Sequence, residues 1–367
     1  MNSYFLVSSY TNNDILAHTP LGKKGEGITL LEYNNNTNIL KKLWSLDLDD
    51  NIAFLLQNEN LIYASTEKIN LDGEILVLSI DKNGAKLLDK KSSCGKSTCY
   101  LNIHNNSLSA VNYWDSKLVT YGLNEKGTFS VLQQIKIQSD YVEKNKPTRE
   151  EHWMFRQKWS HNHCMVTEPY NNNYHYVIDL GNNLIRHLVH DSETCQLIET
   201  KQTLLESGSG PRHLVFHPEK KLAYIINELI STVSIFLYEN DSFTFEKTFS
   251  TLPEDYQNEL VNNSGAWKAK SHASEIRILN NKLFVSNRGH NSIVIYDINE
   301  DGLLYNPKWI NSGGDTPRNF NFSLDNNLLL VGNQNSDECS LFDVSTNKFL
   351  TSIELNSPNY IIPINLL

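Results

Sequence analysis

Apolar and polar residues alternate in short blocks along the chain, most clearly in the stretch 208–238. Three apolar runs, HLVF, LAYIIN and TVSIFLY, follow one another there, with the polar breaks HPEKK and NELIS between them. Runs of four to eight β-prone residues between turn-forming segments are typical of strands, and short separators favour antiparallel neighbours. The stretch therefore predicts three antiparallel strands, with Arg212 before the first and Glu228 at the end of the second.

This block recurs along the chain. In each copy a strand ends in a polar break and is followed by a second β-rich run. Aligning the breaks gives a first column of residues: Tyr10, Glu67, Tyr113, Leu180, Glu228, Arg288 and Gln334. Aligning the starts of the strands that precede the breaks gives a second column: Ala53, Cys99, His163, Arg212, Ser274, Arg318 and Asn359. Repeats of about 40–50 residues with several short strands are typical of a β-propeller.

The two ends of the chain complement each other in this alignment. Tyr10 has no strand start before it, and Asn359 has no break after it. We therefore expect the C-terminal segment SPNYIIPINLL to supply the inner strand of the blade that begins at the N-terminus, which would protect both edges. The fold predicted is an all-β, seven-bladed β-propeller, closed in this way and forming a single domain over residues 1–367.

Both columns are expected to surround one opening of the ring, because antiparallel neighbours start and end at the same side. The polar residues expected there are His163, Arg212, Arg318, Glu67, Glu228, Arg288, Gln334 and Tyr113. His161 lies two residues before His163 and is expected to point to the same side of an extended strand. Taken singly, each residue has a structural explanation, such as an ion pair between Arg212 and Glu228. Their convergence from separate repeats instead favours a site for a small anionic ligand, since arginines bind carboxylate and phosphate in bidentate fashion.

Composition limits the classes of partner and cofactor. The 367 residues are 40% hydrophobic and 20% charged, as in a soluble globular protein with a sizeable core. The formal net charge of −10 argues against general nucleic-acid binding. No apolar run approaches the roughly 18 residues of a membrane span, and no signal-peptide pattern is present, so we expect a cytoplasmic protein without a membrane partner. The five scattered cysteines argue against a disulfide framework, no motif predicts a metal or organic cofactor, and a monomer is expected, with a dimer as the alternative.

Two repeats carry insertions, at residues 138–160 and 253–271. Both are polar, contain Trp153, Trp159 or Trp267, and lead directly into a strand start with a histidine. Loops of this length are often functional, as lids or channel walls, and surface decoration is the alternative.

Several of these segments resemble the lactonase family of seven-bladed propellers, which includes propeller-type 6-phosphogluconolactonases and fungal carboxymuconate-cyclising enzymes. The resemblance covers nearly the whole chain and is carried by GSGPRHLVFHPEKKLAYIINELISTVSIF, ASEIRILNNKLFVSNRGHNSIVIYDI, GGDTPRNFNFSLDNNLLLVGNQNS and RQKWSHNHCMV. It implies active-site roles for Arg212, Glu228, Arg288 and a histidine of the SHNH motif, either His161 or His163. The chain departs from the family at NYW, residues 112–114, where Trp114 is expected to narrow the pocket, and at DLGNN.

Three hypotheses for the function follow. The first is a hydrolase that opens a small anionic sugar lactone, with 6-phosphogluconolactone as the main candidate and a place in the pentose phosphate pathway. In it Glu228 or His163 would accept a proton, and Arg212 or Arg288 would stabilise the oxyanion. Arg318 would hold phosphate, with Gln334, Glu67 and Tyr113 as further substrate contacts. The second is a lactonising cycloisomerase of a carboxymuconate-like polycarboxylate with the same residues, and the third is a non-catalytic interaction platform, because fold alone does not imply function.

Overall fold

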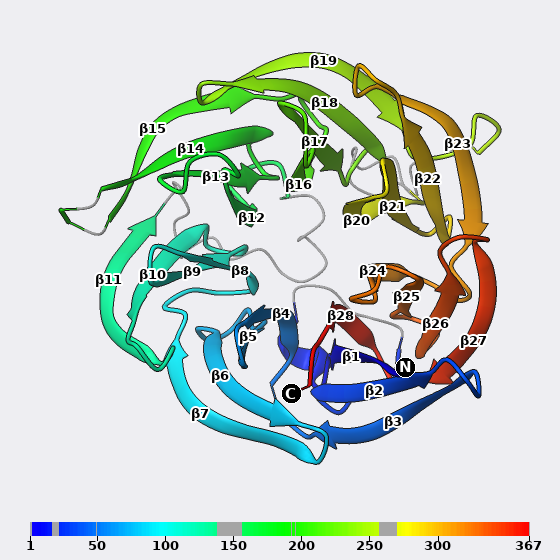
Figure 1. The fold of residues 1–367 in the computed structure, drawn as a ribbon. Coiled ribbons are helices and arrows are strands. Elements are labelled where there is room, and N and C mark those ends of the chain that lie inside the picture. Colours follow the sequence, from blue (N-terminus) through cyan, green and yellow to red (C-terminus); the bar gives the residue numbers. More distant parts are fainter. Residues whose placement is uncertain are drawn as a thin grey trace.

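Seven four-stranded antiparallel sheets form a ring around a central axis in the computed structural model of the protein (Figure 1). The structure describes residues 2–16, 22–48, 50–137, 156–191, 193–194, 196–256 and 270–366. The prediction of a seven-bladed β-propeller is confirmed. A 3-10 helix at Asn13–Ile15 is the one helical element among the described residues.

The blades are numbered in chain order, and their strands run outward from the axis. Blade one contains β28 (Pro358–Pro363), β1 (Asn2–Ser9), β2 (Ile28–Asn34) and β3 (Ile39–Leu46). Blade two contains β4 (Ile52–Asn58), β5 (Leu61–Thr66), β6 (Glu74–Asp81) and β7 (Gly84–Ser92). Blade three contains β8 (Thr98–His104), β9 (Ser107–Asn112), β10 (Lys117–Leu123) and β11 (Phe129–Ile137). Blade four contains β12 (Asn162–Thr167), β13 (Tyr174–Asp179), β14 (Leu184–Asp191) and β15 (Gln196–Leu204).

The remaining three blades have the same plan. Blade five contains β16 (Pro211–Phe216), β17 (Leu222–Asn227), β18 (Thr232–Glu239) and β19 (Ser242–Ser250). Blade six contains β20 (His272–Leu279), β21 (Lys282–Arg288), β22 (Ser292–Ile298) and β23 (Leu304–Asn311). Blade seven contains β24 (Pro317–Phe322), β25 (Leu328–Asn333), β26 (Glu338–Asp343) and β27 (Lys348–Glu354). The three strands predicted within residues 208–238 are thus β16, β17 and β18.

The last strand of the chain closes the ring. β28 pairs antiparallel with β1, with Val7 opposite Ile361, so the inner strand of blade one comes from the C-terminal segment. In Figure 1 the marks for the two chain ends lie on either side of β1 and β28 in blade one. This confirms the closure expected from the incomplete first and last repeats.

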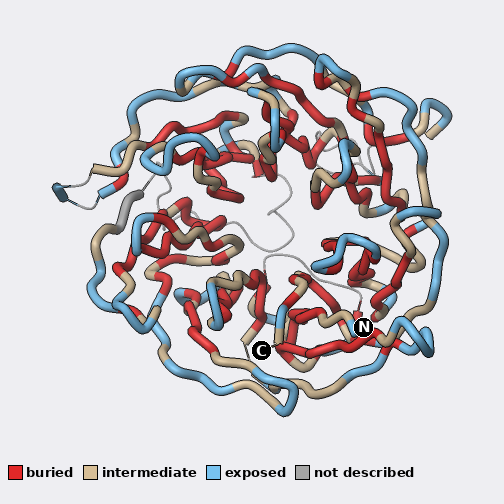
Figure 2. The backbone as a smooth tube through the Cα atoms, in the orientation of Figure 1, coloured by how far each residue is buried: buried red, intermediate tan, exposed pale blue. Residues whose placement is uncertain are grey.

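Burial decreases from the axis to the rim (Figure 2). Every residue of β9, β17 and β25 is buried, because the adjoining blades cover both faces of these strands. The core therefore lies between blades: Tyr224 and Ile226 of blade five, for example, pack in one cluster with Ile276 and Val285 of blade six. Outer strands such as β7 carry mainly exposed or half-buried residues.

The inner strand of every blade contains one extra residue relative to its neighbour. The ladder register shifts by one near the start of each inner strand, as in a β-bulge, which leaves one residue outside the pairing. The extra residues are Ala53, Cys99, His163, Arg212, Arg318, Asn359 and, in blade six, Ser274 or Glu275. The second column of the sequence alignment therefore consists of the bulged positions, where the chain re-aims side chains toward the axis.

Candidate active site

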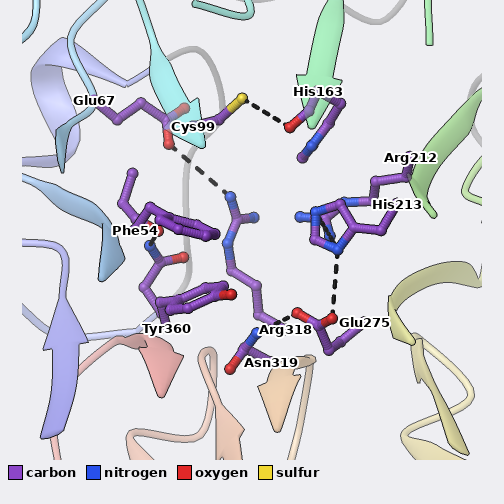
Figure 3. Close-up of a pocket in the computed structure, with 12 residues that line it drawn as sticks. Phe54, Glu67, Cys99, His163, Arg212, His213, Glu275, Arg318, Asn319 and Tyr360 are labelled. Atoms are coloured by element: carbon purple, nitrogen blue, oxygen red, sulfur yellow. Dashed lines mark hydrogen bonds and ion pairs between the residues drawn. The ribbon is translucent and has the colours of Figure 1, made fainter. Parts of the chain in front are cut away.

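A pocket lies on the axis of the ring, where the inner strands converge (Figure 3). Its lining residues are Ala53, Phe54, Glu67, Cys99, His163, Arg212, His213, Glu275, Arg318, Asn319, Asn359 and Tyr360. Six of the seven second-column residues belong to this set. The seventh, Ser274, is replaced in the lining by its neighbour Glu275, and its Oγ donates a hydrogen bond of 2.6 Å to the backbone oxygen of Arg318.

Glycines set the backbone beside two arginines of the site. Gly210, two residues before Arg212, has a φ of +60°, and a Cβ there would lie 2.3 Å from the Leu229 side chain. Gly289, directly after Arg288, has a φ of +100°, and a Cβ there would lie 1.8 Å from a backbone oxygen. Because L residues rarely adopt these angles, glycine allows the two turns to bring their arginines inward.

Glu228 is surrounded by three guanidinium groups. Its carboxylate lies 3.0 Å from Nη2 of Arg288 and 3.0 Å from Nε of Arg212, and it accepts a hydrogen bond from Nη2 of Arg156. The Nε–H of Arg212 does not point along the line to Glu228, so that contact is an ion pair without a hydrogen bond. Burial raises the pKa of Glu228, but the three arginines outweigh it and hold that pKa well below its usual range.

Arg212 connects this cluster with the pocket. Its Nη1 donates to the backbone oxygen of Ser274 and lies 3.1 Å from Nε2 of His213. His213 Nδ1 also lies 3.5 Å from Glu275 Oε1. Burial, and then the charge of Arg212, lower the pKa of His213 to about 4, so this imidazole is neutral at neutral pH.

Arg318 enters the pocket from blade seven. Its Nη2 donates a 2.9 Å hydrogen bond to the hydroxyl of Tyr10, which donates a 2.5 Å hydrogen bond to Glu67 Oε2. Glu67 Oε2 and Arg318 Nη2 are 4.0 Å apart, beyond hydrogen-bond distance. Figure 3 shows the guanidinium group of Arg318 in the middle of the lining residues.

The two histidines of the SHNH motif occupy different positions. His163 is the bulged residue of β12 and lines the pocket. Burial, and then Arg212 and His213, lower its pKa well below the usual value, so it is neutral at neutral pH. His161 precedes the strand, lies 2.9 Å through Nδ1 from the backbone oxygen of Tyr113, and stacks on the Tyr113 ring at 4.6 Å. The bulge at His163 interrupts the strand alternation, and the ring of His163 also contacts that of Tyr113, edge-on at 5.5 Å.

The other predicted contacts lie outside the lining. Tyr113 accepts a 3.1 Å hydrogen bond from Arg156 Nε and so belongs to the Glu228 cluster. Gln334 is buried, and its Nε2 has no hydrogen-bond partner in the part of the chain that the structure describes. Trp114 is buried, with its ring 6.4 Å from that of His161, and does not line the pocket that it was expected to narrow.

Sequence reasoning missed Arg156, His213 and Glu275. Arg156 falls in the 138–160 insertion, which has no counterpart in the other repeats, although it stands five residues before the SHNH histidines. His213 directly follows Arg212, and Glu275 directly follows Ser274, both residues of the second column. Their proximity to the pocket could therefore have been predicted from the same alignment. Trp153 and Trp267 lie outside the described residues, and whether the two insertions act as lids stays a prediction.

Aromatic rings form one wall of the pocket. Phe54 and Tyr360 line it directly, with ring centroids 4.2 Å apart, and the ring of Tyr100 packs against Phe54 at the same centroid distance, tilted by 40°. Such a wall excludes water from the polar groups beside it and strengthens their electrostatic interactions.

Positive charge dominates the site among the described residues. The ionisable groups other than histidine, tyrosine and cysteine are Arg156, Arg212, Arg277, Arg288, Arg318, Glu67, Glu228 and Glu275. Burial is the main cause that lowers the pKa of Arg288 to about 10, which still leaves it charged at neutral pH. In a protein of net charge −10, an excess of arginine here suits an anionic ligand.

Two further properties concern metals and membranes. Within the described ranges, no group of three His, Cys, Asp or Glu residues is arranged to hold a metal ion. No helix in the same residues is long and apolar enough to cross a membrane.

Comparison with known proteins gives relatives along most of the chain. A family model described as "Lactonase, 7-bladed beta-propeller" matches residues 4–357. The uncharacterized protein SAB1858c of Staphylococcus aureus is 28% identical over 338 residues, which cover 89% of this chain and 90% of that one. YwcC of Lactococcus lactis, also uncharacterized, is 38% identical over 140 residues, so this match covers 37% of the present chain and 38% of the relative.

Solved structures share the architecture. A Lactobacillus plantarum protein superposes with a TM-score of 0.82 at 24% identity, over 100% of both chains. The periplasmic gluconolactonase PpgL of Pseudomonas aeruginosa superposes with a TM-score of 0.83 at 21% identity, also over 100% of both chains. A candidate 6-phosphogluconolactonase of Bacteroides fragilis gives 0.78 at 21% identity, over 99% of this chain and 98% of that one. At these identities the structural likeness shows a common fold.

Proposed function

Because this chain belongs to the Lactonase family of seven-bladed β-propellers, we propose that it hydrolyses a small anionic sugar lactone, with 6-phosphogluconolactone as the substrate. One observation carries the proposal. Arg212 and Arg318 bring guanidinium groups into a buried pocket that also holds the neutral imidazole of His163. The proposed reaction needs an anchor for charge, a base for water and a donor for the oxyanion, and these three residue types supply them.

Arg318 is the proposed anchor for the phosphate. Its Nε and Nη1 have no hydrogen-bond partner among the described residues, so the N–H groups of both nitrogens remain for a ligand. Arginine presents paired donors that match two phosphate oxygens, and such charge-assisted hydrogen bonds are roughly twice as strong as neutral ones.

His163 is the proposed base. Its lowered pKa keeps it unprotonated at neutral pH, and its Nδ1 has no hydrogen-bond partner among the described residues. The imidazole would take a proton from water as the water oxygen attacks the lactone carbonyl carbon. It would return that proton to the ring oxygen when the ring C–O bond breaks, which leaves a carboxylic acid that ionises and a free hydroxyl group.

Arg212 is the proposed oxyanion donor. Its Nη2 has no protein partner in the described chain, whereas Nη1 and Nε are held by Ser274, His213 and Glu228. A donor fixed in this way stabilises the developing negative charge without having to reorganise. Glu228 is a poor base, because its arginines hold its pKa low, and its proposed role is to fix Arg212 and Arg288.

Two of the named structures support a lactone as the substrate class. PpgL is named a gluconolactonase, and the Bacteroides fragilis protein a candidate 6-phosphogluconolactonase. A sugar lactone is therefore our proposal ahead of a carboxymuconate. The cytoplasmic location, the monomeric state and the place in the pentose phosphate pathway stay predictions.

The test is a comparison of lactone opening with and without the protein. Glucose-6-phosphate and its dehydrogenase generate 6-phosphogluconolactone in place, and a pH-stat near neutral pH follows acid release. We expect acceleration over the spontaneous rate, with losses of kcat/KM of about 100-fold or more for Arg212→Gln and His163→Asn. Unphosphorylated gluconolactone should react with a higher KM, because it cannot use Arg318.

The control is Lys221→Gln, which removes an exposed ion pair with Glu239 at the surface and should leave the rate unchanged. If the wild type matches the blank for both lactones, the proposal fails, and carboxymuconates become the next substrates to test. Failure with these as well would favour the interaction platform.

A further inference from the structure

Tyr10 bridges two charged residues of the pocket that come from other blades. It follows β1 in blade one, and its side chain is fully buried. Its hydroxyl donates to Glu67 of blade two at 2.5 Å and accepts from Arg318 of blade seven at 2.9 Å. The Arg318 guanidinium carbon also lies 5.4 Å from the centre of the Tyr10 ring, within the range of a cation–π contact.

The bridge holds a carboxylate and a guanidinium group apart. Glu67 Oε2 and Arg318 Nη2 are separated by 4.0 Å, whereas a direct charge-assisted hydrogen bond would bring them to about 2.8 Å. Both side chains are nearly buried, with 8% and 14% of their surfaces exposed, so little water screens their attraction. The Tyr10 hydroxyl takes up the hydrogen-bonding positions through which the two groups would otherwise pair.

The hydroxyl can do this because it is neutral. Burial is the largest cause that raises the pKa of Tyr10 well above its usual value, so the group keeps its proton and donates and accepts at once. A phenylalanine at this position would fill nearly the same space without either bond.

We propose that Tyr10 is a positioning residue that keeps Arg318 available to a ligand anion by preventing a direct hydrogen bond between Arg318 and Glu67. This role builds on the anion anchor of the proposed function, but it concerns binding and does not require hydrolysis. Without the hydroxyl, Glu67 and Arg318 close on each other, and the ligand must then compete with an internal carboxylate.

The test is a double-mutant cycle of Tyr10→Phe and Glu67→Gln on the full chain. Inorganic phosphate is the probe, measured by calorimetry, together with kcat and KM for 6-phosphogluconolactone. Tyr10→Phe should weaken phosphate binding and raise KM by about tenfold, with kcat within about twofold, because the base and the oxyanion donor are untouched. In the Glu67→Gln background the same change should have little effect, because a neutral amide cannot sequester Arg318.

Tyr33→Phe is the matched control, since Tyr33 is a buried tyrosine of the same blade that donates a 2.9 Å hydrogen bond to Asn38. It should leave phosphate affinity unchanged. If Tyr10→Phe fails to fold, the double variant compared with Glu67→Gln still decides, and a tenfold weaker affinity of the double variant overturns the proposal. Unchanged affinity in Tyr10→Phe, or no phosphate binding by the wild type, also overturns it. If phosphate binds and the double-mutant cycle gives the expected result, but the protein does not open the lactone, the lactonase function is refuted and the proposed role of Tyr10 is supported.

Discussion

Glu228 shows how neighbours decide the chemistry of a single carboxylate. A buried glutamate alone would have a raised pKa, but Arg156, Arg288 and Arg212 reverse the sign of the shift. The group therefore stays ionised at every pH at which the protein would work. It serves as a fixed counter-charge that orients guanidinium groups, and the neutral His163 is left as the better proton acceptor.

Substitutions in this cluster should differ in cost. Glu228→Gln leaves three buried arginines without a counter-charge, and we expect it to lower the free energy of unfolding by about 3–5 kcal/mol. Arg156→Gln leaves Glu228 with two arginines as counter-charges and should therefore cost less than Glu228→Gln. Denaturant unfolding at pH 7 measures both.

The loss of stability caused by Glu228→Gln should depend on pH in a definite direction. The pKa of Glu228 is depressed in the folded state, so its stabilisation is present above the unfolded value of about 4.3 and is lost as the pH falls through the folded value. The deficit of Glu228→Gln should therefore shrink below about pH 4. An equal cost for the two substitutions, or a deficit that does not shrink as the pH falls below about 4, would contradict this account.

At the scale of strands, a bulge in each inner strand explains what the repeats predicted and what they did not. The spacing of the repeats was enough to predict the second column, because the extra residue lies near the start of the inner strand in all seven blades. In blade six the register shift spans Ala273 to Ile276, and counting assigned Ser274 to the pocket, whereas Glu275 lines it. Only the paired strand shows which of two neighbours is turned inward. The position of Arg156 could not be predicted either, because it lies in an insertion that has no equivalent residues in the other repeats.

Strand ends also form a histidine seam between blades three and four. His104 ends β8, and its ring centre is 4.4 Å from that of His175 in β13. His104 Nε2 lies 2.8 Å from the Ser109 hydroxyl, and His175 Nδ1 lies 3.1 Å from the Thr167 hydroxyl. Burial and then neighbouring histidines lower the pKa of His104 to about 4 and that of His175 to about 3.

This seam should make the fold sensitive to mild acid. Unfolded histidine has a pKa of about 6.5, so between pH 6.5 and about 4 the unfolded chain binds more protons, and stability falls as the pH falls. Each pKa unit corresponds to about 1.4 kcal/mol, so the loss is on the order of a few kcal/mol. Melting temperatures from pH 7 to 4 should fall less steeply for His175→Gln than for the wild type. Parallel curves would rule out the seam as the cause.

At the scale of the whole molecule, the ring depends on a strand from the far end of the chain. Ile361 of β28 is fully buried and packs in one cluster with Phe5 and Val7 of β1 and with Leu330 of blade seven. Closure thus joins two blades through the core and does more than cover an edge. The sequence predicted this pairing because one repeat lacked its first strand and the last repeat had only that strand.

Ile361→Ala should therefore cost as much as a substitution in the middle of the chain, about 2–5 kcal/mol. Phe349→Ala is the control, because Phe349 lies on the outer strand β27 and is 53% exposed, and it should change stability by about 0.5 kcal/mol or less. Denaturant midpoints compare the two. Similar small effects would mean that β28 is peripheral to the fold.

The contribution of β28 to the pocket has a consequence for biosynthesis. Asn359 and Tyr360 line the pocket, and the ribosome adds them after every other residue of its wall. A nascent chain that has completed blade seven still lacks part of its binding site, and the inner edge of β1 remains open to pairing with other strands. If the pocket binds the ligand as proposed, binding should begin only after this strand has left the ribosome, and chains that stop before residue 358 should not bind phosphate and should be prone to aggregate.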